Sequence, residues 1–353
     1  MDGGKMSEGS YTSSITVLTG LDSVRKRPGM YFGSTSAAGI EYMVGEFASN
    51  AADQFLAGRA TAIAVRLDDA RIVIEDDGSG LPFDEAGPEG SESLATHYLT
   101  TLHAQPTADE HAPHVHIHGF HGVGLAAVNA VSATLRCEAW RGGHLWAQEF
   151  SRGVPTGAPE VVATGHGQGT TISFVPDPEV WGSTRPRPAA IRAQLFLMAH
   201  LIPGLHVRFG EEHFHSLRGL EDLALIELQV TASHIWPWRS RPVFSHRVRT
   251  GDLDIAVAFV GDADESGTRW RTWVNGSETP GHGSHQDGLR DALQEADWAP
   301  ALAMAHLIMH APKFAGPTRD RLDVPEVAAP IQAAVQEAIL RYCEAHDVRR
   351  GHR

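Results

Sequence analysis

The chain has 353 residues, of which 42% are hydrophobic and 20% are charged, an ordinary balance for a globular protein of about two domains. Its formal net charge of −14, with histidine neutral, argues against a protein that holds DNA by itself but leaves room for a local basic patch. The polar N-terminus lacks the apolar core of a secretory signal, and no run reaches the roughly 18 apolar residues of a membrane span. Two cysteines fit a reducing cytoplasm better than a disulfide framework.

The N-terminal part begins with a polar segment over residues 1–18, which we expect to be a flexible arm. A short helix followed by a turn is expected at Pro28 and Gly29. Apolar residues then recur at fourfold spacing, which predicts a helix from Gly39 to Leu56. The runs TAIAVRL and RIVIEDD, with a turn between them, predict a pair of strands.

An irregular segment from Phe83 to His118 is rich in glycine, proline, serine and histidine, and a helical piece from about Ser93 to His103 interrupts it. A segment of this length in a compact domain is usually either functional or disordered. A glycine-rich turn and helix, HGVGLAAVNAVS, come next. Three further runs predict strands: ATLRCEAW, HLWAQEFSRG and TTISFVP.

The proline-rich run VPDPEVWGSTRPRP predicts a domain boundary near residue 180. Beyond it, strands are expected in LHVRFG, LDIAVAFV and RTWVN. Helices are expected in AIRAQLFLMAHLI, GLRDALQEA and AAPIQAAVQEAILRYCEAH. The predicted fold is therefore α+β, with helices on a mixed sheet followed by a second, smaller domain.

Three polar residues of the first long helix share one face, because Glu46, Asn50 and Asp53 are four and then three residues apart. A carboxylate can orient and deprotonate a water, and an amide oxygen can bind Mg²⁺. This face therefore suits the hydrolysis of a magnesium nucleotide. Taken alone, the same spacing also fits a polar stripe that merely faces water.

Two glycine-containing patterns also suit a nucleotide. In EDDGSGLP, glycines let the backbone approach a ligand, and an acid can accept a hydrogen bond from an adenine amino group; an ordinary β-turn explains the same letters. Gly119, Gly122 and Gly124 precede a helix whose N-terminus suits phosphates. This turn follows a loop, so it is not a dinucleotide fingerprint, and the absence of GxxxxGK[ST] excludes a P-loop.

From Tyr11 onward, the order of these patterns resembles the N-terminal ATPase region of DNA gyrase B and its topoisomerase IV counterpart. The string LTGLDSVRKRPGMYFG points to the type IIA topoisomerase branch, since related MutL proteins, histidine kinases and a heat-shock chaperone lack it. The other matching strings are EFASNAADQFLAG, DDGSGLP, TTLHA, HGVGLAAVNAVS, GTTISFVPD, HGSHQDGLRDAL and PKFAGPTRDRL. The resemblance implies a dimerisation arm over residues 1–18, an ATP-binding domain over 19–180 with a lid at about 83–121, and a transducer domain over 181–353.

The resemblance also implies a role for each matching residue. Glu46 would be the general base that activates water, Asn50 the Mg²⁺ ligand, and Asp76 the carboxylate that recognises adenine. Arg319 of the transducer would reach the γ-phosphate of ATP. The remaining matches are Gly80 and Pro82 beneath the adenine, Thr170 at an adenine-site water, Arg141 at the pocket mouth, and the phosphate-binding turn of His121, Gly122, Val123 and Gly124.

Dimerisation on ATP binding is a further implication. With Mg-ATP bound, the lid would close and the arm would cross to a second subunit, where Tyr11 would meet the nucleotide. The arm has few apolar residues and cannot fold alone, because it buries too little surface to offset the entropy of ordering. Hydrolysis would then reopen this homodimer.

Several positions depart from the family pattern. The γ-phosphate loop of the family contains Gln-Thr-Lys, whereas this chain has Pro317, Thr318 and Arg319. Tyr42 stands four residues before the base, where gyrase usually has histidine. A Glu–Arg pair near the adenine is replaced by Gln54 and Ser79 together. We expect ATP binding to be retained, whereas these changes leave the rate of hydrolysis open.

The chain contains neither an EGDSA-type metal-binding domain nor a tyrosine-bearing cleavage domain, so we expect no DNA cleavage by this chain alone. It would act as an ATP-dependent clamp, with DNA cleavage on a separate subunit. The alternatives are a standalone regulatory, resistance or defence ATPase that does not change DNA topology, and a nucleotide-binding module with little turnover.

Other polar clusters have two interpretations. His114, His116 and His118 alternate and would suit Zn²⁺ on one side of a strand, or they belong to a polar lid without metal. A basic stretch, which contains Arg239, Arg241, Arg247 and Arg249, would face DNA or form a solvated strand edge. The acids of the run Asp252–Asp254 are expected to face solvent rather than bind a metal.

Overall fold

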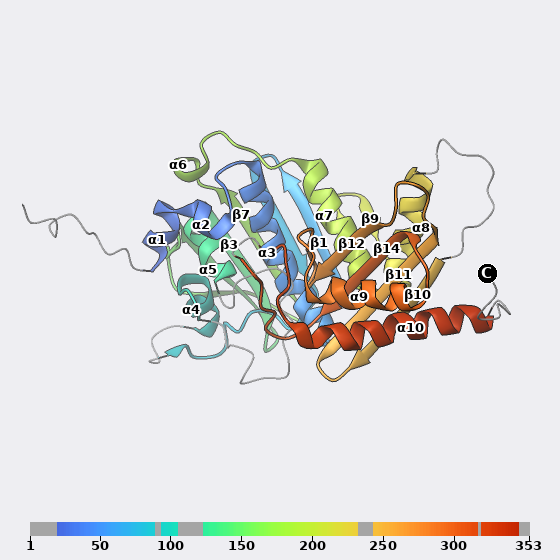
Figure 1. Ribbon diagram of the computed structural model, residues 1–353. Coiled ribbons are helices and arrows are strands. Elements are labelled where there is room, and N and C mark those ends of the chain that lie inside the picture. The colour runs from blue at the N-terminus through green and yellow to red at the C-terminus, as the bar shows by residue number, and fades with distance from the viewer. Residues whose placement is uncertain (1–19, 89–92, 105–122, 232–242, 317–318, 346–353) are drawn as a thin grey trace, which may run out of the picture.

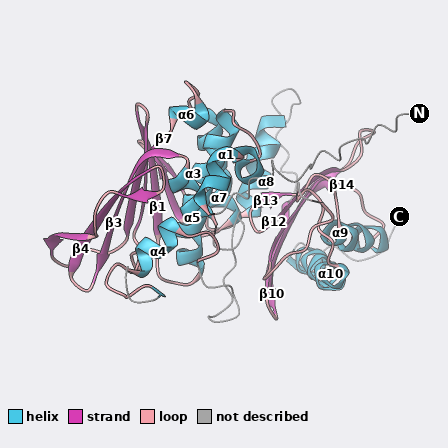
Figure 2. Ribbon diagram, turned by 90° about the vertical axis from the view of Figure 1, so that its left-hand side faces the viewer, coloured by secondary structure: helices cyan, strands magenta, loops and turns pink. Residues whose placement is uncertain are grey.

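The computed structural model describes residues 20–88, 93–104, 123–231, 243–316 and 319–345. The described chain forms two β-sheets with helices packed against both (Figures 1 and 2). Helices cover one face of the first sheet, and the second sheet lies on the far side of these helices (Figure 2). The α+β class and the mixed sheet expected from the sequence are confirmed.

The first sheet has nine strands in the order β5-β4-β3-β7-β2-β1-β8-β9, with β6 paired to β4. All described pairings are antiparallel except that of β1 with β8. The expected pair of strands, β1 and β2, is confirmed. The strands are β1 (Ala62–Asp68), β2 (Arg71–Asp76), β3 (Ser132–Arg141), β4 (His144–Ser151), β5 (Val154–Pro155), β6 (Glu160–Thr164), β7 (Thr170–Pro176), β8 (His206–Phe209) and β9 (Glu212–Phe214).

The long helix α3 (Ala37–Leu56) is the centre of the helical layer and confirms the expected helix. The Ser36 hydroxyl caps its first turn by accepting a hydrogen bond from the Ala38 amide. Pro28 begins a second short helix instead of a turn, since proline suits the first position of a helix. The other helices of this part are α1 (Leu21–Lys26), α2 (Pro28–Phe32), α4 (Leu94–Thr100), α5 (Gly124–Ala130), α6 (Pro178–Trp181) and α7 (Pro188–Leu201).

The second sheet has five strands in the order β10-β11-β14-β12-β13. Its strands are β10 (Val243–Thr250), β11 (Leu253–Asp262), β12 (Arg269–Val274), β13 (Ser277–Glu278) and β14 (Pro300–Ile308). Its helices are α8 (Leu220–Thr231), α9 (Ser284–Glu295) and α10 (Ala328–Ala345), with a short 3₁₀ turn, η4 (Pro325–Val327), before α10. Helices α9 and α10 pack together against the outer face of this sheet (Figure 2).

Both faces of the second sheet are buried. Residues of β11, β12 and β14 join the core of the first part, including Val260, Trp273 and Met304. The opposite face packs on α9 and α10. The two sheets are therefore joined through one continuous apolar core.

The boundary expected near residue 180 does not coincide with the limits of the sheets. Strand β8 pairs in parallel with β1, so residues 206–214 complete the first sheet. The buried carboxylate of Glu41 on α3 accepts hydrogen bonds from the backbone and the guanidinium of Arg187, which fixes the start of α7 against α3. The backbone after the proline-rich run is thus anchored to the first part of the molecule.

The expectation that the acids of the 252–254 run face solvent is wrong for Asp254, which is buried. Burial alone raises the pKa of this carboxyl, but hydrogen bonds from Arg247 and Arg249 hold the pKa below its usual range. Two arginines of the basic stretch therefore pair with an acid of the same sheet; Arg239 and Arg241 lie outside the described residues. In the part of the chain that the structure describes, no helix is long and apolar enough to cross a membrane.

Candidate functional site

Glu46 lies on the buried face of α3, and its carboxylate is held between two neighbours. Tyr42, one helical turn earlier, hydrogen-bonds to Glu46. Burial, together with the negative charge of Glu46, raises the pKa of the Tyr42 phenol, so the phenol stays protonated and donates to the carboxylate. On the other side, a Cβ added to Gly124 would lie 2.2 Å from Oε2 of Glu46, so a side chain there would force the carboxylate out of its present position.

The second part of the molecule contributes Arg319 to this cluster. The positive charge of Arg319 acts on Tyr42 and partly offsets the rise in the pKa of the phenol. Arg319 is half-buried, and its guanidinium carbon lies 6.0 Å from the centroid of the Phe314 ring. The site therefore combines a carboxylate, a phenol and a guanidinium from two parts of the chain.

Asn50 and Asp53 follow Glu46 along α3, as the spacing predicts. Among the described residues, the half-buried side chain of Asn50 has no hydrogen-bond partner, and its amide oxygen is a suitable ligand for a hard cation. Asp53 is 9% exposed, which is too little for a stripe that merely faces water. The polar face of α3 thus points into the protein rather than into bulk solvent.

Two adjacent acids at the end of β2 have different environments. Asp77 accepts hydrogen bonds from the amides of Thr61 and Ala62 and from the Thr61 hydroxyl, so it fastens the start of β1. The side chain of Asp76 accepts one from the Gly78 amide at 2.8 Å. Burial raises the pKa of Asp76 to about 6, although the amides of Gly78 and Thr170 act in the opposite direction.

Close backbone contacts shape the turn after Asp76. Gly80 has a φ of 75°, and a Cβ there would lie 2.3 Å from the Trp140 carbonyl oxygen. Gly169 has a φ of 96°, and its Cβ would lie 1.9 Å from the Asp76 carbonyl oxygen. Glycine is required at both positions by the left-handed backbone and by the absence of space. Pro82 is half-buried in the same turn, and Thr170 is buried and pairs with Asp76 between β7 and β2.

The neutral pair that replaces the Glu–Arg pair of the family is present, since the Ser79 hydroxyl donates to Oε1 of Gln54 at 3.0 Å. Arg141 donates to Asp84 at 2.9 Å and also contacts Glu85. Both acids belong to the start of the expected lid. The described part of that lid is tied to the rest of the protein, because the Asn129 amide donates to the Leu99 carbonyl of α4.

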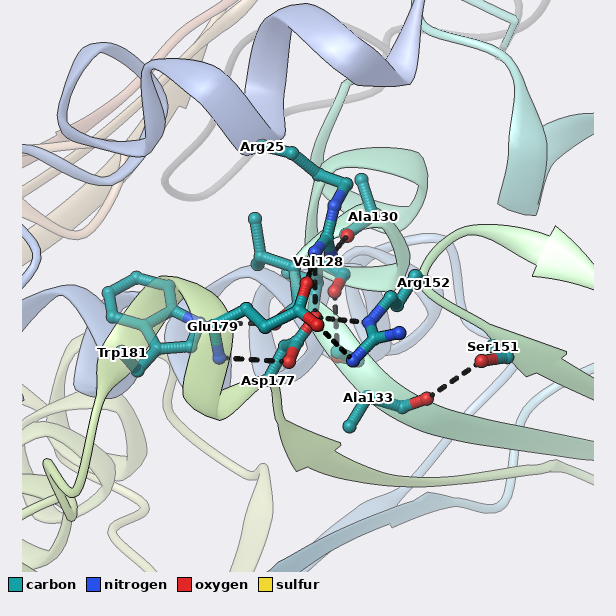
Figure 3. A network of polar contacts seen from close by, with 11 residues as sticks. Arg25, Val128, Ala130, Ala133, Ser151, Arg152, Asp177, Glu179 and Trp181 are labelled. Carbon is teal, nitrogen blue, oxygen red and sulfur yellow. Dashed lines mark hydrogen bonds and ion pairs between the residues drawn. The ribbon is translucent and has the colours of Figure 1, made fainter.

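The end of α5 opposite Gly124 is anchored by a polar network (Figure 3). Arg25 donates to the Ala130 carbonyl at 2.7 Å and contacts the fully buried carboxylate of Asp177 at 2.8 Å. Arg152 lies on the other side of Asp177, also at 2.8 Å, and Glu179 contacts both arginines. Arg25 belongs to the string LTGLDSVRKRPGMYFG, so this string fixes the helix that begins at Gly124 beside Glu46.

Some predicted residues lie outside the described part of the chain. They are Tyr11 of the arm, His121 and Gly122 of the phosphate-binding turn, and the lid histidines 114, 116 and 118. Val123 is buried and precedes α5 directly. Within the described residues, no group of three or more histidine, cysteine, aspartate or glutamate side chains is arranged to hold a metal ion.

The chain is similar in sequence to known proteins. Residues 35–180 match the family model described as histidine kinase-, DNA gyrase B-, and HSP90-like ATPase. Over 93% of its length the chain is 30% identical to the B-type subunit of DNA topoisomerase 4 from Caulobacter vibrioides, of which it covers 52%. It is 32% identical, over 94% of its length, to DNA gyrase B of Thermus thermophilus, of which it covers 56%. The chain therefore spans about half the length of these curated relatives.

Solved structures show the same fold. The ATPase domain of Thermus thermophilus gyrase B, determined in complex with an aminocoumarin, superimposes with a TM-score of 0.76 at 28% identity, covering 93% of this chain and 90% of that one. The ATP-binding domain of topoisomerase IV from Francisella tularensis, in complex with a small-molecule inhibitor, gives a TM-score of 0.75 at 24% identity, with 93% of both chains covered.

Proposed function

Because residues 35–180 match the family model described as histidine kinase-, DNA gyrase B-, and HSP90-like ATPase, we propose that this chain binds Mg-ATP and hydrolyses it with Glu46 as general base. The adenine amino group donates a hydrogen bond to Asp76. The turn at Gly80 and Pro82 lies beneath the adenine ring and supports it. The triphosphate extends from there to the N-terminal end of α5 and the turn that precedes it.

The polar cluster around Glu46 performs the hydrolysis. The Tyr42 hydroxyl donates to one side of the Glu46 carboxylate and holds it in place, and the carboxylate takes a proton from the attacking water. Arg319 stabilises the negative charge on the γ-phosphate during the reaction. Tyr42 thus takes the place of a histidine, and it donates to Glu46 without titrating near neutral pH.

Asn50 fits the magnesium ion of the nucleotide, since its amide oxygen lies one helical turn beyond Glu46 and is a hard ligand. Bound magnesium would neutralise part of the triphosphate charge. The other described residues around the phosphates contribute backbone amides and the Arg319 guanidinium.

We also propose that ATP binding closes a dimer, with the arm of residues 1–18 crossing to a second subunit so that Tyr11 reaches its nucleotide. This part rests on the resemblance to DNA gyrase B, and it makes the chain an ATP-dependent clamp. The transducer assignment and a mobile lid within about residues 83–121 are proposals of the same kind. A regulatory ATPase without any effect on DNA topology is not favoured, because the likeness to a topoisomerase subunit extends over 93% of the chain.

The observation that carries the proposal is the position of Tyr42, which hydrogen-bonds to Glu46 of the first part of the chain and is acted on by the positive charge of Arg319 from the second part. We therefore predict that Arg319→Ala lowers the ATP turnover number by on the order of 100-fold, as expected for loss of a group that stabilises transition-state charge. Arg319→Lys keeps the charge and serves as the matched control. Phosphate release measured at saturating Mg-ATP tests this, and an Arg319→Ala variant as active as wild type would contradict the assignment.

A further inference from the structure

The backbone of Arg319 is held in an unfavourable conformation. Its φ of 55° lies in the left-handed region, which is unfavourable for a non-glycine residue. Such a conformation persists only where the surrounding structure enforces it. The residues that enforce it therefore decide where the Arg319 side chain points.

Arg319 begins the second arm of a hairpin-like pair of segments, residues 313–316 and 319–324. The Ala315 amide donates to the Arg321 carbonyl at 3.0 Å, and the Asp323 amide donates to the Lys313 carbonyl at 2.8 Å. The Arg319 amide donates to the Gly316 carbonyl at 3.3 Å. These bonds close the segment on itself but do not fix it to the rest of the protein.

The start of α9 supplies that attachment. The Gly281 amide donates to the Asp320 carbonyl at 2.9 Å, and the Ser284 amide donates to the Leu322 carbonyl at 3.0 Å. Gly283, with a φ of 129°, allows the close approach, because a Cβ there would lie 2.4 Å from the Leu322 carbonyl oxygen. The segment after Arg319 therefore lies directly against residues 281–284.

The side chain of Ser284 adds two hydrogen bonds between these two segments. Its hydroxyl donates to the Leu322 carbonyl at 3.3 Å and accepts from the Val324 amide at 3.0 Å. Ser284 is 8% exposed, so water cannot readily replace these bonds. One hydroxyl thus bridges two backbone groups on the segment that carries Arg319.

We infer that Ser284 is a positioning residue for Arg319, an assignment that rests on the proposed role of Arg319 in ATP hydrolysis. Its hydroxyl fixes residues 319–324 so that the guanidinium stays where its positive charge acts on Tyr42. This inference links two of the matching strings, because Ser284 of HGSHQDGLRDAL positions Arg319 of PKFAGPTRDRL.

A double-mutant cycle on the full chain tests this inference. Ser284→Ala lowers the ATP turnover number about tenfold, whereas in the Arg319→Ala background the same substitution changes turnover by less than about twofold, because no guanidinium is left to position. Ser284→Thr keeps the hydroxyl and restores turnover to within about threefold of wild type. Ser245→Ala is the matched control, since it removes a hydroxyl that donates to Glu221 in the same half of the chain, away from the hairpin.

Nucleotide discrimination gives a second readout that a merely structural serine would not move. By calorimetry, Ser284→Ala weakens the affinity for a non-hydrolysable ATP analogue about tenfold and leaves ADP affinity unchanged, since Arg319 reaches only the γ-phosphate. Should Ser284→Ala not fold, Ser284→Cys, which keeps the volume with a weaker hydrogen-bonding group, takes its place.

Each other outcome overturns the inference in a distinct way. An equal loss of turnover from Ser284→Ala with and without Arg319, or a parallel loss of ADP affinity, shows that Ser284 does not act through Arg319. If Arg319→Ala itself leaves turnover unchanged, the proposed role of Arg319 fails and the inference fails with it.

Discussion

Asp76 and Asp77 show how adjacent identical residues acquire different environments. The fold alone makes them different, because the Asp77 carboxylate already accepts hydrogen bonds from the amides of Thr61 and Ala62. The partial burial that prepares Asp76 to accept from a ligand also raises its pKa to about 6. The resemblance selects Asp76 as the carboxylate that recognises adenine, and the different surroundings of the two acids are consistent with that proposal.

The raised pKa of Asp76 predicts opposite effects on stability and on binding. Its folded-state pKa of about 6 lies above the ordinary value of 3.8, so its contribution to folding stability is complete below about pH 4 and is lost as the pH rises through 6. At pH 7.5, Asp76→Asn should therefore raise the melting temperature of the nucleotide-free protein while weakening ATP binding.

The affinity of the wild-type protein for ATP should also fall as the pH drops below about 6, because the carboxylate becomes protonated, and Asp76→Asn should remove that part of the pH dependence. Thermal melting and calorimetric titration from pH 5 to 8 test both effects. An Asp76→Asn variant with unchanged ATP affinity at pH 7.5 argues against an adenine contact at this residue.

For Tyr42, the sequence identifies the residue type but not its contacts. Its departure from the family pattern is visible in the sequence, but its hydrogen bond to Glu46 and its proximity to Arg319 are not. The same holds for Ser284, whose two backbone partners lie about 40 residues further along the chain. Contacts between distant segments depend on topology, which local spacing does not encode.

At the scale of elements, helices and strands with a clear period were predicted well. Helix α3 and strands β1, β2, β3, β4 and β7 lie where the sequence places them. Strand β14 and helix α8 were not predicted. Because β14 is buried on both faces, its run PALAMAHLI has no alternation, and its alanines and leucines favour helix as much as strand.

The packing of α5 against α3 supports a prediction about Gly124. A methyl group at this position would collide with the end of the Glu46 side chain, which can move away at little cost to folding. Gly124→Ala should therefore lower ATP turnover at least tenfold while changing the melting temperature little. Gly29→Ala is the matched control, because nothing lies within 4 Å of its added Cβ.

Steady-state phosphate release and thermal melting of the Gly124→Ala variant together distinguish a role of Gly124 in catalysis from a role in folding. Full activity of Gly124→Ala would show that the contact between α5 and Glu46 is not needed for catalysis. A large drop in melting temperature with proportional loss of activity would instead assign Gly124 to folding alone.

For the whole molecule, the resemblance predicts a dimer that depends on nucleotide. The arm cannot fold alone, so it should associate stably only when ATP prepares a partner surface. A non-hydrolysable ATP analogue with Mg²⁺ should convert the monomer, or a loosely associated pair, into a stable dimer, and ADP should not. Deletion of the residues before Ser14 should abolish this dimer, slow hydrolysis and leave ATP binding measurable.

Light scattering after size exclusion gives the mass in each state. An unchanged mass with and without the analogue would contradict the clamp.

The sequence could not show how the two parts of the molecule meet, since the continuous core between the sheets and the approach of Arg319 to Tyr42 arise only on folding.

The central claim is that this chain hydrolyses ATP with Glu46 as general base, and one comparison tests it most directly. Phosphate release from saturating Mg-ATP is measured for the wild-type protein and for Glu46→Ala, with calorimetric binding of an ATP analogue to both. We predict wild-type turnover, a loss of roughly 100- to 10,000-fold in Glu46→Ala, and near-equal affinity for the analogue. A Glu46→Ala variant that releases phosphate as fast as the wild type would contradict the claim.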